Sequence, residues 1–487
     1  MIIRIKINGF KSLIDTELYF GPFTCIAGAN AIGKSNFFDA LSFLSKLSDN
    51  TTLFAAKTVR SESQKHANIK DIFFRNGEEY LDKMSFEVDM IVPSEAEDDL
   101  GQVAKATITS LRYTLILKLN DELSEKEPIE IVKEELSPIT LGDTKKMLHF
   151  DPSKEWVASV LAGRRSTSIP FISTDGEIIK LHSDTNMKKR GGRTTEFIAQ
   201  KMPRTLLSTV TAESPTAFLA RQEMRNWMML QFEPSALRQP NSIYEVKNAE
   251  ITANGHNLPA TLYRLQSDKK DIDIYQRLTN KLKELVEDVN EITVDKDEKR
   301  DLLTLQLGFK NGLLLPAQSL SDGTLRFLGL AVIEQDSMSS GLICLEEPEN
   351  GINPKKVHEM VELLKGMATD TEYEVGDDNP LRQVIINTHS PIVVSTVPDE
   401  SLYLAKSKEC IIESFSKKVK RTGFSALKNT WKTNNGLVEE TTLGEITSYL
   451  DKSYDTSNGH EEVMLSNSKE KRKFTVAENI QQLKLEF

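Results

Sequence analysis

GANAIGKS, residues 28–35, fits the pattern G-x-x-x-x-G-K-[ST], in which glycines let backbone N–H groups close around phosphate oxygens. An apolar segment typical of a strand, FTCIAG, precedes it, and a segment with helical spacing, NFFDALSFLSKL, follows it. An ordinary glycine-rich turn would need neither flank. The stretch therefore predicts a phosphate-binding loop, in which Lys34 neutralises the β and γ phosphates of a nucleotide and the Ser35 hydroxyl ligates Mg²⁺.

The segments around this loop indicate an α/β protein. The strand segments IIRIKI and DTELYF come before it, and three more lie within residues 84–137, the first two separated by an acidic loop at 93–101. After residue 341, GLICLEE, NPKKVHEMVELLKGM and RQVIINTH alternate as strand, helix and strand, which is typical of a parallel sheet with crossover helices. We therefore expect a mixed or parallel sheet with an antiparallel β subdomain.

The composition bounds the class of protein. A chain of 487 residues exceeds what one hydrophobic core usually supports, so we expect two or three subdomains or one domain with a large insert. The net charge of -11 argues against nucleic acid coating the whole surface, although a local basic patch fits within an acidic average. The cysteines, Cys25, Cys344 and Cys410, lie far apart in apolar sequence, which indicates reduced thiols and a cytoplasmic location. The N-terminal segment lacks the features of a secretion signal, and the longest apolar run, Phe327–Ile333, is too short for a membrane span.

The middle of the chain differs in character. An insert is rich in basic residues: Arg164, Arg165, Lys188, Lys189, Arg190 and Arg193. These side chains are candidates for contacts with nucleic-acid phosphates or with an acidic partner. A solvated loop of mixed charge is an equally good interpretation. A helix is expected over 216–232. The 4-3-4-3 spacing from Leu278 to Ile292 predicts another helix, which is too short for a coiled coil.

Two apolar strands end in residues that suit phosphate chemistry. LICLEEPENGINP, residues 342–354, ends in Glu346, a candidate Mg²⁺ ligand, and Glu347, a candidate base for the attacking water. VIINTHSP, residues 384–391, ends in His389, which is expected next to them within reach of the γ-phosphate. Without the phosphate loop, a solvated turn and a structural histidine would be the better interpretations.

SLSDGTLRF, residues 319–327, opens an apolar helix with small polar residues. Free N–H groups and the helix dipole favour phosphate at such an end, so Ser321 and Gly323 are candidates for a second phosphate contact. Two phosphate loops and one catalytic glutamate are easiest to reconcile if the second loop caps a nucleotide held by another copy of the chain.

In this order, GANAIGKS, SLSDGTLRF, ICLEEPENGINP and NTHSP resemble the P-loop, signature, Walker B with D-loop, and switch histidine of ABC-type ATPases of the SMC, RecF and OLD class. GFKS at 9–12 and EEPENGINP look most like the ATPases of bacterial defence and OLD-like systems, and EITANGHNLPATLYRLQ at 250–266 also looks like a segment of that family. The closest resemblance is to the ATPase subunits of two-component anti-phage defence systems of the Septu and PARIS types.

The resemblance implies an ABC-type P-loop ATPase head, ATP and Mg²⁺ as cofactors, and roles for single residues. The implied cofactor-binding residues are Gly28, Asn30, Gly33, Lys34, Ser35, Asn36, Ser321 and Gly323. The implied metal ligands are Ser35 and Glu346, and the implied catalytic residues are Glu347, His389 and Lys34. Ser321 and Gly323 would act across a head-to-head dimer. The turn at 350–353 is the expected D-loop, and the Q-loop glutamine has no clear position in the sequence.

The departures from the family narrow the expected function. The long coiled coils of SMC proteins and the acidic motifs of the Toprim domain of OLD nucleases have no counterpart in the sequence. We therefore expect a slow ATPase that forms a homodimer or higher oligomer around ATP and controls a separate effector, a nuclease or toxin, in anti-phage defence. The alternatives are a RecF-like DNA-binding repair ATPase and a scaffold that uses ATP as a structural ligand.

The expected domain organisation has four parts. An ATPase lobe with an antiparallel β subdomain covers 1–145, and an inserted basic, α-rich region covers 146–245. A second ATPase lobe with the signature, Walker B and switch histidine covers 246–415, and a C-terminal extension covers 416–487.

Overall fold

The computed structural model describes residues 1–60, 68–120, 128–163, 169–182, 194–268, 273–412, 415, 417–442 and 444–446. The six basic residues expected to contact nucleic acid or an acidic partner, Arg164, Arg165, Lys188, Lys189, Arg190 and Arg193, lie outside the described residues.

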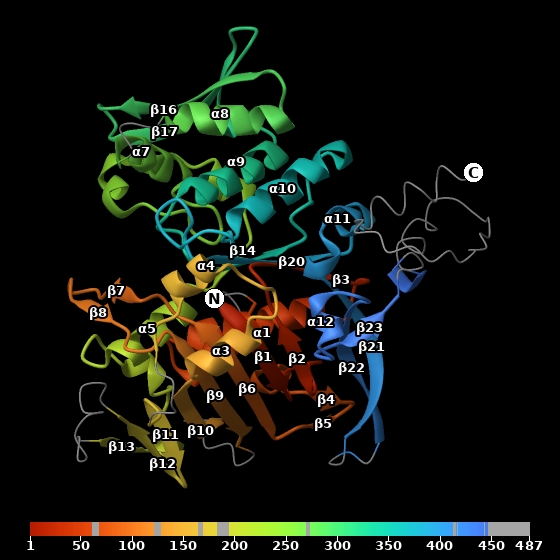
Figure 1. Cartoon of the computed structure of the whole chain (residues 1–487). Helices are drawn as coiled ribbons and strands as arrows, with labels where there is room; N and C mark the ends of the chain where they lie inside the picture. Colours follow the sequence, from red (N-terminus) through yellow and green to blue (C-terminus); the bar gives the residue numbers. More distant parts are fainter. Residues whose placement is uncertain are drawn as a thin grey trace.

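An eight-stranded antiparallel sheet forms the lower part of the molecule in Figure 1. Its strands, in spatial order, are β13 (Thr195–Ile198), β12 (Ile178–Leu181), β11 (Ile172–Asp175), β10 (Ile129–Pro138), β9 (Ser110–Leu119), β6 (Lys83–Ile91), β1 (Ile2–Asn8) and β2 (Thr16–Tyr19). Buried and half-exposed residues alternate along β9, because one face of an antiparallel sheet packs on the core and the other meets water. These strands are the expected antiparallel subdomain, and the sheet continues beyond residue 145 because β11 pairs with β10.

A seven-stranded sheet carries the phosphate-binding loop. Its strands, in spatial order, are β14 (Met228–Leu230), β19 (Gly341–Glu346), β20 (Arg382–Thr388), β3 (Phe23–Ala27), β21 (Leu402–Ile412), β22 (Lys417–Leu427) and β23 (Glu439–Thr441). The first five run parallel, and β22 pairs antiparallel with β21. All seven residues of β20 are buried, because helices cover both faces of this sheet.

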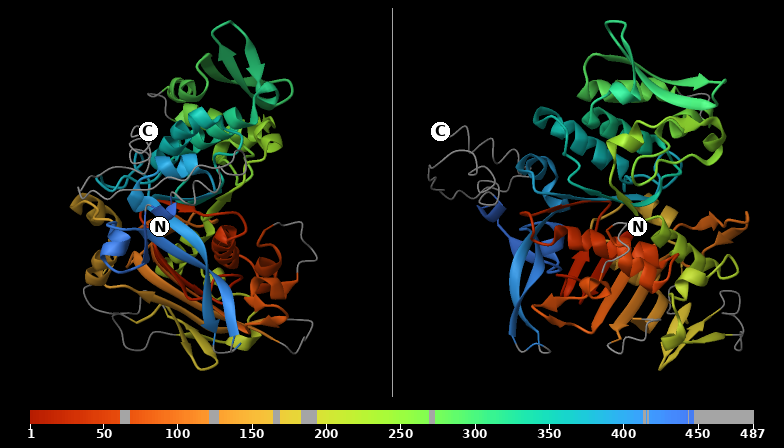
Figure 2. Two further views of the ribbon diagram at one scale, coloured as in Figure 1. Left: turned by 90° about the vertical axis from the view of Figure 1, so that its right-hand side faces the viewer. Right: turned by 180° about the vertical axis from the view of Figure 1, so that it is seen from behind.

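The helices on the two faces of this sheet belong to different hydrophobic clusters. On one face α1 (Lys34–Leu47) shares a cluster with strands of both large sheets. On the other face α9 (Asp322–Gln335) and α10 (Val357–Met367) pack with α7 (Leu258–Asp268) and α8 (Ile274–Leu285). These helices lie above the sheet in Figures 1 and 2, together with a small sheet of β15 (Asn241–Ser242), β16 (Val289–Asp297), β17 (Leu302–Phe309) and β18 (Leu314–Pro316).

The remaining helices and hairpins are short. The helices are α2 (Thr52–Lys57), α3 (Leu141–Met147), α4 (Lys154–Val160), α5 (Pro215–Arg225), α6 (Pro234–Leu237), α11 (Pro391–Thr396) and α12 (Trp431–Asn434). The hairpins are β4 (Arg75–Asn76) with β5 (Glu79–Tyr80), and β7 (Glu95–Glu97) with β8 (Val103–Lys105). The expected acidic loop at 93–101 is therefore partly a strand. The described part of the insert, which was expected to be α-rich, contains β11–β15 as well as α4, α5 and α6.

Two predicted helices end earlier than expected. The helix predicted from Leu278 to Ile292 is α8 only as far as Leu285, and Val289 begins β16. Ile292 is buried opposite Leu307 of β17, so cross-strand pairing of β-branched residues overrides the helical spacing. The helix predicted over 216–232 ends at Arg225, because residues 228–230 form β14 and complete the edge of the parallel sheet.

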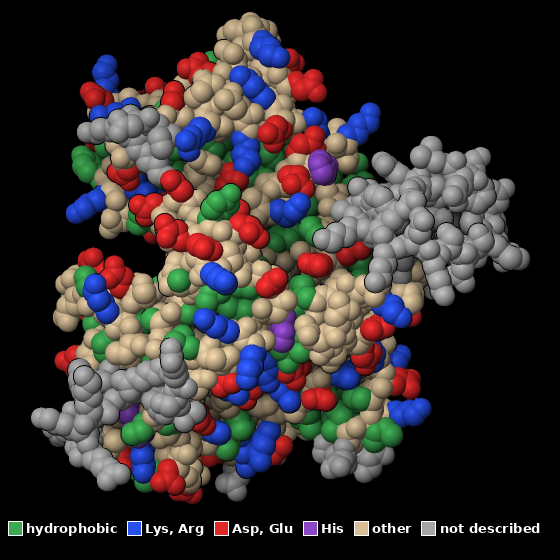
Figure 3. All heavy atoms as spheres, in the orientation of Figure 1, with side chains coloured by type: hydrophobic (Ala, Val, Ile, Leu, Met, Phe, Trp, Pro, Cys, Tyr) green, Lys and Arg blue, Asp and Glu red, His purple; other side chains and the backbone are tan. Residues whose placement is uncertain are grey.

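The surface and the described helices agree with the composition. On the face shown in Figure 3, acidic and basic side chains are interspersed. All three cysteines are free, and Cys25 and Cys344 are buried. No helix among the described residues combines the length and hydropathy that crossing a bilayer requires, and these residues contain no long coiled coil.

Candidate functional site

The phosphate-binding loop connects β3 to the N-terminus of α1, as the sequence predicts. Gly33 has a φ of 101°, and a Cβ there would lie 2.2 Å from Thr422 Oγ1 and 2.6 Å from Ser12 Oγ. Only glycine therefore fits between the loop and these two hydroxyls. The Thr422 hydroxyl donates to the Ile32 carbonyl over 2.9 Å, so β22 holds the loop in place.

Lys34 is folded back over its own loop. Its Nζ donates to the Gly28 and Ala29 carbonyls over 2.6 and 2.9 Å. Burial lowers the pKa of Lys34, and the negative charges of Glu346, Glu347 and Glu349 oppose that shift. A triphosphate would offer this ammonium stronger, charged acceptors than the two carbonyls.

A cavity of about 410 Å³ opens at the loop, lined by residues 30–36 with Arg60, Glu347 and Asn387. Asn387 is the next-to-last residue of β20, and its Oδ1 accepts the Glu347 N–H over 3.3 Å. Its Nδ2 is buried without a hydrogen-bond partner among the described residues. A buried amide that lines a cavity and lacks an acceptor indicates a ligand that supplies one.

Ser35, which lines this cavity, is in contact with Glu346. The Ser35 hydroxyl donates to Glu346 Oε2 over 3.1 Å, and Glu346 ends β19. Burial raises the pKa of Glu346, and the Ser35 hydrogen bond works against that shift. A hydroxyl and a carboxylate beside a phosphate site are oxygen donors that suit Mg²⁺, which is commonly held by one or two protein oxygens together with phosphates and water.

Glu347 and His389 are in contact. His389 Nδ1 lies 2.7 Å from Glu347 Oε1, and Asn350 Nδ2 donates to Glu347 Oε2 over 2.9 Å. Glu347 has a φ of 47°, a left-handed conformation that is uncommon outside glycine and is often found at functional sites. The turn after β19 therefore directs this carboxylate toward the end of β20.

The predicted second phosphate loop does not line this cavity. Ser321 is exposed and caps α9, with its Oγ accepting the Thr324 N–H over 3.2 Å. Gly323 is buried, and a Cβ there would lie 2.3 Å from the Gly351 carbonyl oxygen. The small residue at 323 therefore has a packing role within the chain, against the turn at 350–353.

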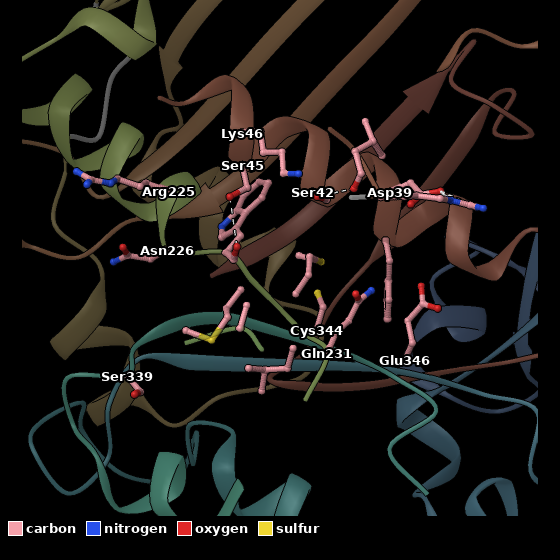
Figure 4. A pocket seen from close by; sticks show the side chains of 18 of the residues that line it. Asp39, Ser42, Ser45, Lys46, Arg225, Asn226, Gln231, Ser339, Cys344 and Glu346 are labelled. Carbon is pink, nitrogen blue, oxygen red and sulfur yellow. Dashed lines mark hydrogen bonds and ion pairs between the residues drawn. The ribbon is translucent and has the colours of Figure 1, made fainter. Parts of the chain in front are cut away.

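Two residues that the sequence interpretation missed also lie at the site. Arg60 lines the cavity and donates to Asp39 Oδ2 over 2.9 Å, and Lys11 donates to the same oxygen over 2.7 Å. Gln231 directly follows β14 and lines a larger cavity of about 880 Å³ together with Ser35 and Glu346. Figure 4 shows Gln231 and Glu346 near one another at one end of this cavity, opposite Asp39 and Ser42 of α1.

The sequence did not indicate a role for Gln231, because residues 228–230 lie at the end of the helix predicted over 216–232. Recognising β14 as a parallel strand next to β19 would have shown that Gln231 lies at the carboxyl edge of the sheet, where ligands bind.

Comparison with known families agrees with this geometry. A family model described as "AAA domain" matches residues 4–307, well over half of the chain. The chain belongs to this AAA-domain family. Within the AAA-domain protein, a second model, described as "AAA domain, putative AbiEii toxin, Type IV TA system", matches residues 237–395. Together with the sheet order, this family shows a mixed α/β P-loop ATPase fold, and it supports ATP binding and ATPase activity.

Solved structures of SMC heads are similar to the AAA-domain protein. The head described as bound to the C-winged helix domain of ScpA shares 12% identity over 88% of this chain and 98% of its own, with a TM-score of 0.44. The SMC head domain from Thermotoga maritima shares 12% identity over 88% and 99%, with a TM-score of 0.37. The Pyrococcus furiosus Smc head with an extended coiled coil, bound to the C-terminal domain of ScpA, shares 12% identity over 90% and 99%, with a TM-score of 0.40. No curated protein matches the sequence.

Proposed function

We propose that this AAA-domain protein binds ATP with Mg²⁺ at the P-loop, hydrolyses it slowly, and dimerises around ATP to control a separate effector protein. One observation carries the proposal. The cavity lined by the P-loop also receives Asn387, whose buried amide lacks an acceptor, and the Glu347 carboxylate that contacts His389. These are the groups needed to bind a triphosphate and to activate water beside it.

The chain's own residues divide the work. Lys34 exchanges the Gly28 and Ala29 carbonyls for phosphate oxygens. Glu347 accepts a proton from the attacking water, and His389 holds that carboxylate in position through the 2.7 Å contact. Asn350 fixes the second carboxylate oxygen over 2.9 Å. Gln231, beside Glu346, is suited to hold a water or a phosphate oxygen with its amide.

Ser35 and Glu346 would hold the Mg²⁺ ion, which when bound stabilises negative charge on the phosphate oxygens. Their separation of 3.1 Å is a hydrogen bond that either oxygen gives up on binding a cation. The raised pKa of Glu346 also fits, because a cation would restore the charged form of the carboxylate.

Dimerisation around ATP is proposed because Ser321, an exposed helix cap, does not line the nucleotide cavity of its own chain. A second copy would bring Ser321 and Gly323 to the γ-phosphate. The position of Ser321 at the start of α9 suits that role, because the N-terminus of a helix attracts anions.

The effector is proposed to be a nuclease or toxin in bacterial anti-phage defence. The segments at 9–12, 250–266 and 346–354 that resemble defence ATPases support this role, as does a family description that mentions a toxin and a Type IV TA system. The RecF-like alternative depends on the basic residues at 164–193, which lie outside the described residues.

The test uses Glu347→Gln, which preserves the shape of the side chain and removes its basicity. With ATP and Mg²⁺, this variant should elute as a dimer in size-exclusion chromatography with light scattering, and with ADP as a monomer. Glu362→Gln on the exposed surface of α10 is the matched control and should behave like the wild type. A Glu347→Gln protein that is saturated with ATP and still monomeric would contradict the dimer. A wild-type chain that binds ATP without turnover would favour the structural-ligand alternative.

A further inference from the structure

A second cavity, of about 580 Å³, adjoins the P-loop, and five of the fourteen residues that line it are lysines or arginines. Its basic residues come from separate elements: Lys11 from the turn between β1 and β2, Lys57 from the end of α2, Arg60, Arg75 from β4, and Lys420 from β22. We call it the basic cavity. Figure 1 shows the β4–β5 hairpin beside the β21–β22 hairpin, and Phe74 and Phe415 pack there with ring centroids 6.0 Å apart.

The charges in the basic cavity do not balance. Lys11 and Arg60 share one carboxylate, Asp39, and the cavity's own lining contains one acidic residue, Asp71. Among the described residues, no carboxylate lies within ion-pair distance of Lys57, Arg75 or Lys420. Among the described residues, five cations therefore face two carboxylates at this cavity, in a chain whose net charge is -11. Uncompensated cations converging on a concave surface attract anions.

The basic cavity is contiguous with the nucleotide site. Asn36 and Arg60 line both cavities. Lys420 lies two residues before Thr422, so both side chains are on the same face of β22, and Thr422 contacts the P-loop at Ile32. An anion bound here would therefore lie next to the nucleotide and share side chains with its site.

The shape and chemistry of the basic cavity favour phosphate groups over nucleobases. Phe73 and Phe74 line it but are 1% and 3% exposed, so neither offers a free ring face for stacking. Arginine and lysine side chains from three elements suit the several oxygens of a phosphate ester. The volume is that of a small-molecule site.

We propose that the basic cavity is a second anion site, in which Lys57, Arg75 and Lys420 bind a phosphate ester other than the triphosphate held by the P-loop. Such an ester reaches the cavity either as a free phosphorylated nucleotide or as the phosphodiester of a nucleic-acid strand. Because the two cavities share Arg60 and Asn36, occupancy of the basic cavity should change the affinity for ATP.

The test uses the full chain carrying Glu347→Gln and saturated with ATP, so that the P-loop is filled. Two phosphate probes are titrated: adenosine 3′,5′-bisphosphate by calorimetry, and a fluorescein-labelled 12-nucleotide oligo(dT) by anisotropy. A labelled oligoglutamate peptide serves as a non-phosphate anion. The test variant is Lys57→Ala/Arg75→Ala/Lys420→Ala. The control, Lys145→Ala/Lys146→Ala/Lys154→Ala, removes three exposed charges from α3 and α4.

At least one phosphate probe should bind, and the test variant should weaken that binding at least tenfold while the control stays within twofold. For the oligonucleotide, three phosphate contacts predict a log–log salt slope of about −2, so raising salt from 50 to 200 mM should weaken binding roughly 20-fold. Binding of the bisphosphate alone would identify a free nucleotide as the source, and binding of the oligonucleotide alone a nucleic acid.

The proposal is overturned if neither phosphate probe binds, if oligoglutamate binds as well as both of them, or if the test variant binds like the control. The single charge reversal Lys420→Glu changes the surface less than the triple variant and should also weaken binding of the phosphate probe. The thermal unfolding midpoint of this variant shows whether it is still folded. ATP binding by the test variant is measured separately. If the test variant still binds ATP, a loss of phosphate-probe binding concerns the basic cavity alone and not the proposed ATP site.

Discussion

His389 Nδ1 lies 2.7 Å from Glu347 Oε1, although the two residues belong to different strand ends of the parallel sheet. The contact joins the turn after β19 to the end of β20, and it places a carboxylate with a fixed orientation at the mouth of the P-loop cavity. His389 does not line that cavity, so its effect on ATP is expected to pass through Glu347.

Replacing His389 with alanine should therefore slow hydrolysis without weakening ATP binding. The change removes the contact to Oε1 of Glu347 and leaves the hydrogen bond from Asn350 to Oε2, so the carboxylate is less well oriented, and a mispositioned base reduces the rate by about 10²-fold. Steady-state phosphate release and ATP affinity of the same preparation check the prediction. A large fall in affinity with unchanged kcat would show that His389 contacts the nucleotide directly.

Replacing Lys34 with alanine should abolish ATP binding. The lysine is the one cation of the 28–35 loop, and its Nζ lies over the loop carbonyls where the phosphates are expected. We expect the affinity to fall by at least about 100-fold, since a charge-assisted contact in a partly buried site is worth several kcal/mol. ATP-induced stabilisation against thermal unfolding measures the loss. Lys6→Ala, on the exposed face of β1, should keep the wild-type shift.

Replacing Gly323 with alanine should destabilise the protein. The new methyl would lie 2.3 Å from the Gly351 carbonyl oxygen, so either α9 or the turn at 350–353 must move. Overpacking of this kind lowers the free energy of unfolding by about 1–3 kcal/mol. Gly142→Ala in α3 is the matched control, because a Cβ there meets nothing within 4 Å. Urea denaturation measures the free energy of unfolding of both variants. Equal values would show that the turn at 350–353 moves to accept the methyl group without loss of stability.

Replacing Lys432 with methionine should change how stability depends on pH. This lysine is fully buried, its Nζ has no hydrogen-bond partner among the described residues, and it lies 4.0 Å from the centre of the Tyr403 ring. Burial lowers the pKa of Lys432 from 10.5 to about 7. Between these two values the unfolded chain carries a proton on this side chain that the folded chain lacks, so this residue makes stability rise with pH across that window.

In Lys432→Met that contribution is absent. The free energy of unfolding of the wild type should rise relative to the variant by up to about 1.4 kcal/mol per pH unit between pH 7.5 and 9.5. Urea denaturation at several pH values measures the difference between the two proteins, which removes the effect of the other titrating groups. Parallel curves would show that the amine finds a polar partner or water in solution.

The sequence determined the local parts of the nucleotide site. The strand before residue 28, the loop at 28–35 and the helix after it follow from glycine placement and apolar spacing, which act over a few residues. The carboxylates of Glu346 and Glu347 and the imidazole of His389 could likewise be placed at strand ends, because the carboxyl ends of parallel strands share one edge of the sheet. Ser321 could be recognised as a helix cap from its residue type and position.

Tertiary structure decided the rest, because the deciding contacts join residues that are far apart in the chain. Residues 228–230 become β14 only by pairing with β19, and that pairing places Gln231 beside Glu346. Val289 leaves the helical pattern because β17 offers it a partner strand. Arg60 reaches the P-loop cavity through Asp39, and Lys420 joins Lys57 and Arg75 only when β22 lies against the loop. The spacing of residues along a sequence indicates which side chains share one face of a single helix or strand. Which residues line the same cavity depends on how these helices and strands pack together.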